Sequence, residues 1–309
     1  MVLVDTLLNC PSRLLMRQLK GISTSSRERG FDITVDSAHV DARATAFVTG
    51  AQAGLRGGDF GSVHERLAEI PANLRGFAYE GAGMTAHLLD SIVPGRRWRV
   101  RLLLGGPGYR YRYLVHVGVG WGMARLRQST PREAWGLDPL LRWLALDGVG
   151  FHRVYFARAA ERRSLIQRPV RSAAQHIVKQ GMGRALWFVH GADQRRIAEA
   201  LEPCGDEVQD ALWRGIGLAG EYAGGTQFAP KALLAAAGRH APAVRQGLRF
   251  GLAAKHAHVL AGTLDAQRAA GDARECSVFA DDAAVSLTTH NAAANCYRQW
   301  QYEVERAEL

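Results

Sequence analysis

The chain has almost no lysine: four of its 39 basic residues are lysines and the other 35 are arginines. The formal net charge is +10, which raises nucleic acid as a partner. The densest basic runs are RRWRVR at 96–101 and YRYRY at 109–113. Such runs can stack on bases, but they also suit a solvated face, and an anionic carrier protein or its phosphopantetheine arm would be attracted equally. Since the arginines are otherwise spread through the chain, we do not expect nucleic acid to be the partner.

Long apolar runs and paired cysteines are also missing. No stretch of eighteen apolar residues lacks a charge, so we expect no membrane span. The N-terminus has a short apolar patch without basic residues ahead of it, which is atypical of a signal peptide. Cysteines stand at 10, 204, 276 and 296 without C-x-x-C spacing. They predict reduced thiols in a cytoplasmic protein rather than a zinc site or a disulfide framework.

Several familiar catalytic motifs are absent. The chain contains no His-Glu-x-x-His, no Glu-x-x-His and no Gly-x-Ser-x-Gly. The sequence therefore does not support a zinc protease helix, a di-iron carboxylate bundle or a serine hydrolase elbow.

What the chain does have is a regular repeat of glycine pairs. Gly-x-Gly begins at Gly81, Gly118, Gly148, Gly181 and Gly215. A degenerate sixth copy begins at Gly247, where Arg249 replaces the second glycine. The first glycines stand 37, 30, 33, 34 and 32 residues apart. A period in the low thirties is typical of stacked helical hairpins.

The columns of the repeat describe a helix. Relative to the first glycine, positions −4, −3 and +1 are apolar in all six copies, and positions +3 and +7 are mostly apolar. Positions −4, −3, +3 and +7 share one helical face with the glycine. Four copies have a leucine fourteen residues upstream, which fits a preceding helix, and Pro71 and Pro203 mark the turn. The sequence predicts an all-α fold of about six hairpins of 30–37 residues, stacked into an α/α superhelix or toroid-like array.

One integrated domain is predicted, in three parts. Residues 1–58 form an N-terminal segment and cap with a short extended stretch at 31–35, and residues 59–262 carry the repeats. The glycine-rich segment 105–108 is expected to be a surface turn. Residues 263–309 form a C-terminal helical cap, with a helix start near 281 and an amphipathic segment at 290–305.

The repeated glycines need compensation, because each glycine inside a helix costs about 1 kcal/mol relative to alanine. Either neighbouring helices pack closely across the missing side chains, or the glycines leave room for a ligand. A dinucleotide-binding loop is a third interpretation, but one fold binds one dinucleotide in one turn, and here the pair recurs.

Position −1 is polar in five of six copies, beside columns that are apolar. The residues are Glu80, Asp147, Gln180, Arg214 and Gln246. A carboxylate on a mainly apolar helix is expensive to bury unless it is paired. One hypothesis is structural: Glu80 or Asp147 pairs with Arg184 or Arg214 and fixes the register of the stack.

The other hypothesis is a functional pocket. Its candidate catalytic groups are Glu80, His116, Asp147, His152 and Arg184. His116, His152 and one carboxylate could also hold a metal ion, although the sequence does not commit to one. The step of five residues from Asp147 to His152 does not place both on one helical face.

Several of these segments carry a resemblance. They are GFAYEGAGM at 76–84, VHVGVGW at 115–121, LDGVGFH at 146–152, QGMGRALWF at 180–188, and GIGLA at 215–219 with YAGG at 222–225. In order and spacing, the chain from about residue 25 to 260 resembles the bacterial family of unknown function that includes UnbL proteins. Those proteins are encoded in gene cassettes for enediyne polyketides. The resemblance implies a role in natural-product biosynthesis beside an iterative polyketide synthase, and it assigns no chemical activity.

Two functions therefore stay open. The first is an enzyme or enzyme component that acts on a polyene intermediate in an apolar groove, where the candidate catalytic groups supply proton transfer or ligation. The residues expected to contact the substrate are Tyr79, Trp121, Phe151, Gln180, Trp187, Trp213 and Tyr222. The second is a non-catalytic protein that shelters the polyene or docks the synthase, since helical arrays commonly serve binding. The sequence does not identify a cofactor.

Overall fold

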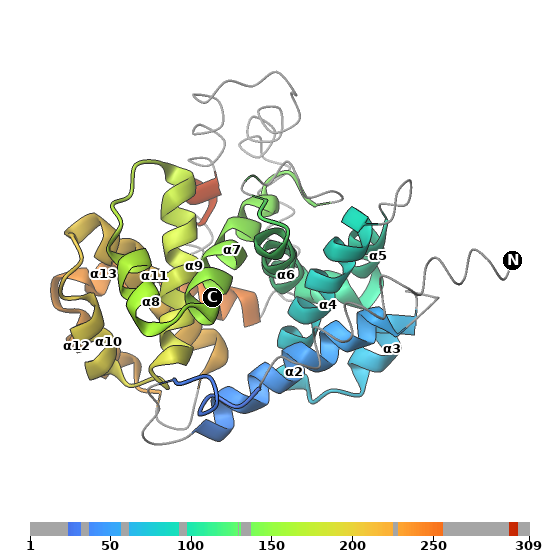
Figure 1. Ribbon diagram of the computed structural model, residues 1–309, viewed down its shortest axis with the longest axis horizontal. Coiled ribbons are helices and arrows are strands. Elements are labelled where there is room, and N and C mark those ends of the chain that lie inside the picture. Colours follow the sequence, from blue (N-terminus) through green and yellow to red (C-terminus); the bar gives the residue numbers. More distant parts are fainter. Residues whose placement is uncertain are drawn as a thin grey trace, which may run out of the picture. The chain divides into compact units, whose positions relative to one another are not determined.

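The computed structural model describes residues 24–31, 37–56, 62–92, 98–128, 130, 137–224, 228–255 and 297–301. Within these ranges every regular element is a helix and there is no strand, as the ribbon shows (Figure 1). The predicted all-α class is confirmed. The chain divides into two compact units, Met1–Leu137 and Asp138–Leu309.

In the first unit, long helices alternate with short ones. The elements are α2 (Ser37–Leu55), α3 (Val63–Ala68), α4 (Ala72–Ile92), α5 (Arg99–Leu103), the 3-10 helix η2 (Gly106–Tyr111) and α6 (Arg112–Arg125). The predicted turn at Pro71 stands directly before α4. Helix α4 packs against α2 on one side and α6 on the other, so the long helices contact each other in chain order.

The second unit repeats this alternation. Its elements are η4 (Leu141–Trp143), α7 (Leu144–Phe156), α8 (Ala159–Gln167), α9 (Ala173–Val189), α10 (Gln194–Leu201), α11 (Asp206–Ala223), α12 (Pro230–Ala237), η5 (Gly238–His240) and α13 (Ala241–Lys255), with a helical turn at 297–301. The main contacts join α7 to α9, α9 to α11, and α11 to α13. The long helices are again neighbours in chain order.

Local sequence sets the ends of several helices. The Ser172 hydroxyl accepts from Gln175 N at the start of α9, and the Asp193 carboxylate accepts from Arg195 N and Arg196 N at the start of α10. These side chains satisfy main-chain N–H groups that have no partner inside the helix. Helix α11 ends at Gly224, whose φ of 62° lies in the left-handed region that favours glycine.

Glycines let the long helices of the first unit approach at main-chain distance. A Cβ atom added to Gly81 of α4 would lie 1.9 Å from Phe47 O of α2, and one added to Gly50 of α2 would lie 1.9 Å from Ala78 O of α4. The same exchange joins α4 to α6, where a Cβ atom added to Gly83 would lie 2.6 Å from Val115 O and one added to Gly118 would lie 1.9 Å from Glu80 O. The carbonyl oxygens stand where a glycine Cα hydrogen points, the arrangement of a Cα–H···O contact.

The second unit contains three more such exchanges. The glycines and the carbonyl oxygens that they face, with the distance from an added Cβ atom to the oxygen, are Gly150 and Val178 (1.9 Å), Gly181 and Asp147 (1.8 Å), Gly183 and Leu212 (2.0 Å), Gly215 and Gln180 (1.8 Å), Gly217 and Val244 (2.5 Å), and Gly247 and Arg214 (2.0 Å). All six distances are too short for a Cβ atom. At these positions close packing is confirmed, and the interpretation that the glycines leave room for a ligand is wrong.

The sequence missed one glycine-bearing helix. Helix α2 lies within 1–58, the segment predicted to precede the repeats. Its Gly50 makes the same contact as the second glycine of a pair, but residue 48 is a valine, so a search for Gly-x-Gly does not find it.

The other local predictions are confirmed only in part or lie outside the described residues. Gly105 and Gly106 are exposed, but Gly108 is buried against Leu103 O, so only part of 105–108 is a surface turn. Of the predicted extended stretch, Phe31 alone is described. The helix start near 281 lies outside the described residues. Part of the amphipathic segment, 297–301, is helical and buries Tyr297 and Gln301.

None of the described helices is both long and apolar enough to cross a bilayer.

Candidate functional site

The polar residues at position −1 lie at the contacts between the long helices. Glu80, Asp147 and Gln180 are each no more than 3% exposed, and Arg214 is 9% exposed. The main-chain carbonyl of each residue faces the first glycine of the following long helix. Their side chains therefore start from the most tightly packed point of each helix pair and must find partners there.

Asp147 of α7 finds two partners on α9. Its Oδ1 forms an ion pair with the Arg184 guanidinium, and its Oδ2 accepts from Gln180 Nε2 at 3.0 Å. Gln180 Oε1 in turn accepts from Gln301 Nε2 at 3.5 Å. We call these four residues the Asp147 network. The Asp147–Arg184 pair is one of those predicted to fix the register of the stack.

Arg184 also contacts an aromatic ring. Its guanidinium carbon lies 5.2 Å from the centroid of Phe151, a distance typical of a cation–π contact. Phe151 packs against Tyr155 and Phe188, with centroid distances of 5.3 and 5.5 Å. The charged pair is thus enclosed by side chains of α7 and α9.

In the first unit, Glu80 is bonded to a tryptophan. Trp121 Nε1 of α6 donates to Glu80 Oε1 of α4 at 3.0 Å. The Trp121 ring lies 4.3 Å from the Phe47 ring of α2, measured between centroids. One carboxylate therefore fixes a side chain that reaches across to a third long helix.

His116 of α6 is 1% exposed and bonded to its own helix. Its Nδ1 lies 2.7 Å from Arg112 O, one helical turn earlier. Because a carbonyl oxygen can only accept, Nδ1 carries the proton, and Nε2 is the acceptor of the neutral ring. His152 of α7 is half-buried, and its ring centroid lies 4.6 Å from that of Phe156.

The predicted catalytic residues thus separate into two sets. Glu80 and His116 belong to the first unit, whereas Asp147, His152 and Arg184 belong to the second. Within the second unit, Asp147 and Arg184 are in contact. In the part of the chain that the structure describes, no group of three His, Cys, Asp or Glu side chains could hold a metal ion.

Tyr79, a predicted substrate contact, is buried in the first unit and contacts the half-buried His64 and Tyr111. His64 Nε2 lies 3.4 Å from Leu102 O, so it donates, and His64 Nδ1 accepts from the Tyr79 hydroxyl at 2.9 Å. Tyr111 stacks on the Tyr79 ring at 4.5 Å. Burial, aided by Tyr111, raises the pKa of Tyr79 to about 12, so the hydroxyl stays a donor at neutral pH.

The predicted tryptophan contacts of the second unit are core residues. Trp187 of α9 is 0% exposed and Trp213 of α11 is 2% exposed, whereas Tyr222 is half-buried. The Trp187 ring meets the Phe228 ring edge-on at 5.5 Å. Among the described residues, no acceptor lies within hydrogen-bond distance of Trp187 Nε1. A buried N–H without an acceptor is unusual and calls for an explanation.

Sequence reasoning did not single out Lys179 as a site residue. Its Nζ is buried and donates to Leu165 O at 2.7 Å and Ile166 O at 2.8 Å, at the C-terminal end of α8. Burial lowers the pKa of Lys179 to about 8. Cys204 is also buried, and its thiol donates a hydrogen bond from Sγ to Ile166 O at 3.7 Å. Burial raises the pKa of this thiol. The signal for Lys179 in the sequence was its place directly before Gln180, at position −2 of the repeat, where the first two copies carry Tyr79 and His116.

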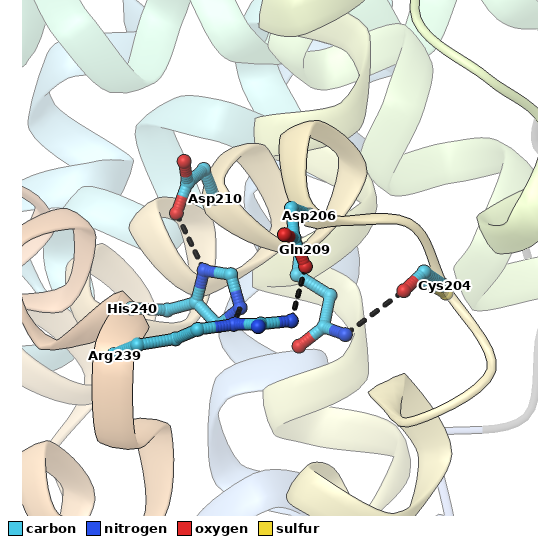
Figure 2. Close-up of polar contacts among 6 residues, drawn as sticks. All are labelled: Cys204, Asp206, Gln209, Asp210, Arg239 and His240. Atoms are coloured by element: carbon cyan, nitrogen blue, oxygen red, sulfur yellow. Dashed lines mark hydrogen bonds and ion pairs between the residues drawn. The ribbon is translucent and has the colours of Figure 1, made fainter.

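A second polar cluster joins the start of α11 to η5 (Figure 2). His240 Nε2 accepts from Arg239 Nε at 3.2 Å, so the neutral ring carries its proton on Nδ1, which donates to Asp210 Oδ1 at 2.6 Å. Arg239 also pairs with Asp206, and Gln209 Nε2 donates to Cys204 O at 2.9 Å. An aspartate that orients a histidine is common in catalytic sites, but here the second ring nitrogen is already occupied. The cluster therefore joins η5 to α11.

Neither a curated protein nor a solved structure matches this chain. A family model does match, over residues 8–308, and its description reads "Protein of unknown function (DUF1702)". Because the match spans nearly the whole sequence, the chain belongs to the DUF1702 family.

Proposed function

We propose that this protein binds a polyene intermediate in the biosynthesis of an enediyne-type polyketide, and that its buried carboxylates serve packing rather than proton transfer. The resemblance of the motifs at 76–84, 115–121 and 146–152 to the family that includes UnbL proteins supports the biosynthetic setting. Binding is the role that the contacts of the described residues favour.

The same proposal includes the finer architecture. Each long glycine-bearing helix, with the short helix before it, would be one copy of a two-helix module, stacked within each unit as in an α/α superhelix or toroid-like array. The alternation of short and long helices and the repeated glycine exchange support this arrangement. Such arrays commonly serve binding.

The observation that carries the proposal is the Trp187 indole N–H. It is buried, and none of the described residues offers it an acceptor. A buried donor left without a partner costs about 1–3 kcal/mol. The carbonyl oxygen of a bound thioester or ketone would supply the acceptor once the side chains that cover the 0% exposed Trp187 ring move aside. The Trp187 and Phe228 rings would pack against a conjugated chain.

The carboxylates, in contrast, are already occupied. Asp147 is bound by Arg184 and Gln180, and Glu80 by Trp121. A general base must lie within hydrogen-bond reach of the proton that it removes. Asp147 would have to leave two partners to do so.

An enzyme that uses acid–base chemistry is the second candidate, because His152 is a half-buried imidazole five residues from Asp147 on α7. A histidine that solvent reaches can exchange protons with water. Replacing His152 by glutamine would abolish product formation on this second hypothesis and leave it intact on the first.

The proposal is tested with Trp187→Phe, which keeps an aromatic ring and removes the N–H. The variant and the wild type are titrated calorimetrically with a synthetic polyene thioester. We expect binding about tenfold weaker, since one hydrogen bond contributes about 1.4 kcal/mol. Trp300→Phe, at a half-buried tryptophan outside the proposed site, is the matched control and should bind as the wild type does. Equal affinity in all three proteins, or no binding by the wild type, would refute the proposal.

A further inference from the structure

The exposed apolar side chains of the described residues gather in one short stretch. Four large hydrophobic residues of the described chain are more than 36% exposed: Ile92 at 41%, Trp98 at 38%, Leu102 at 37% and Tyr109 at 39%. They belong to the end of α4, to α5 with its N-cap, and to η2, which contact each other in the first unit. Exposed apolar residues gathered in this way mark an interaction site more often than scattered ones do.

The same stretch has one sign of charge. Between residues 91 and 132 there are nine arginines, no lysine, no aspartate and no glutamate. Arg101 and Arg110 are exposed and directly precede and follow Leu102 and Tyr109 in the chain, respectively. We call Ile92, Trp98, Arg101, Leu102, Tyr109 and Arg110 the α5–η2 surface.

The α5–η2 surface stands on a fixed backbone. The carboxylate of Asp90, itself 4% exposed, accepts from Arg99 N at 3.2 Å and Val100 N at 3.1 Å and pairs with the Arg99 guanidinium at 3.1 Å. Val100 and Leu103 are buried on the opposite side of the same short helix. The apolar side chains are therefore displayed by an anchored element, and the Asp90 carboxylate is neutralised within it.

Two of the exposed rings are already oriented by arginines. The guanidinium carbon of Arg99 lies 5.4 Å from the Trp98 ring centroid, and that of Arg112 lies 4.5 Å from the Tyr109 ring centroid. Cation–π contacts of this kind limit the freedom of both side chains. A partner would therefore meet side chains that lose little entropy on binding.

We infer that the α5–η2 surface docks an acidic protein, and specifically the phosphopantetheine-bearing carrier domain that would deliver the polyene. This partner rests on the proposed function. Protein interfaces are enriched in tryptophan, tyrosine and arginine and depleted of lysine, which is the composition of this surface. The exposed Ile92 and Leu102 add aliphatic area that base stacking does not use. The arginine forks suit carboxylates and the phosphodiester of the carrier arm.

The test uses the full chain and a phosphopantetheine-loaded carrier domain of an enediyne-type polyketide synthase. Affinity is measured by calorimetry at low and at physiological salt. We expect binding that weakens with salt, and a loss of at least tenfold for Trp98→Ala and for the double variant Arg101→Ala/Arg110→Ala. Arg195→Ala, at a 75% exposed arginine of α10, is the control and should bind as the wild type does.

Three results would overturn the inference. One is the absence of carrier binding by the wild type. Another is carrier binding that none of the surface variants weakens. The third is a loss, in the same variants, of binding to single-stranded DNA or to anionic phospholipid vesicles while carrier binding persists. If the polyene thioester binds and the carrier does not, the docking surface alone is refuted. If the carrier binds and the thioester does not, polyene binding alone is refuted.

Discussion

Asp147 shows at the scale of one residue why a buried carboxylate need not be catalytic. Burial of an isolated charge is prohibitive, but Arg184 and Gln180 supply a counter-charge and a second hydrogen bond. The sequence predicted this pair among its alternatives, because position −1 was polar beside apolar columns and position +3 of one copy was an arginine. It could not select the pair, since the side chains meet only when α7 and α9 are packed.

Asp147→Asn tests the structural role of this residue. The amide keeps the shape of the side chain but removes the negative charge that pairs with the buried Arg184 guanidinium. We expect the free energy of unfolding to fall by about 3–5 kcal/mol, as when one partner of a buried ion pair is removed. Glu199→Gln, in an exposed pair with Arg195, is the control and should change it by less than about 0.5 kcal/mol. Chemical denaturation measures both, and a fully stable Asp147→Asn would contradict the account.

Lys179 makes stability depend on pH. Its pKa is about 8 in the folded protein, below the ordinary value of 10.5. Between these two values the unfolded chain binds a proton that the folded protein does not, so stability rises with pH. Below about pH 8 both states are protonated and the contribution of Lys179 is constant.

Comparison with Lys179→Met isolates this effect. The wild type should gain up to about 3 kcal/mol in free energy of unfolding between pH 8 and pH 10.5, relative to the variant. Lys255→Met, at a lysine 39% exposed, is the matched control for the removal of a charge. Parallel stability curves for the wild type and Lys179→Met over this range would show that Lys179 does not titrate as described.

At the scale of the element, the glycine pair fixes the distance between helices. Each exchange uses the second glycine of one helix and the first glycine of the next, with main-chain carbonyls as their contacts. This explains why the period was readable in the sequence. It also explains why α2 was missed. In α2 only the position of the second glycine, Gly50, packs against a neighbouring long helix, so the Gly-x-Gly pair is incomplete there.

Gly215→Ala tests the close approach of α9 and α11. Alanine favours a helix by about 1 kcal/mol over glycine, so propensity alone predicts stabilisation. The added Cβ would instead lie 1.8 Å from Gln180 O, and the helices must separate. We expect a net loss of about 3 kcal/mol in the free energy of unfolding.

The control for this variant is Gly205→Ala. Gly205 precedes α11, has a φ of −65°, and nothing lies within 4 Å of an added Cβ. Its replacement should change stability by less than about 1 kcal/mol. Stabilisation by Gly215→Ala would mean that α9 and α11 do not meet at main-chain distance.

At the scale of the whole molecule, the sequence predicted the class of fold better than the site. Helical periodicity is local and survives in a single sequence, so the long helices at 77–88 and 211–222 were readable. Hydrogen bonds between helices depend on packing. The sequence therefore did not predict the hydrogen bond from Trp121 to Glu80, or that the described residues offer no acceptor to the N–H of Trp187. The division into two units was not predicted either, because no change of composition marks residue 137.

We proposed that this protein binds a polyene and that its buried carboxylates do not transfer protons. Glu80→Gln separates packing from proton transfer, because the amide oxygen can still accept from Trp121 Nε1 while the acid–base group is lost. The measurement is the product formed by a strain that lacks this gene and carries the variant. We predict product at the wild-type level from a variant that folds. A folded Glu80→Gln protein that binds polyene and restores no product would contradict the account.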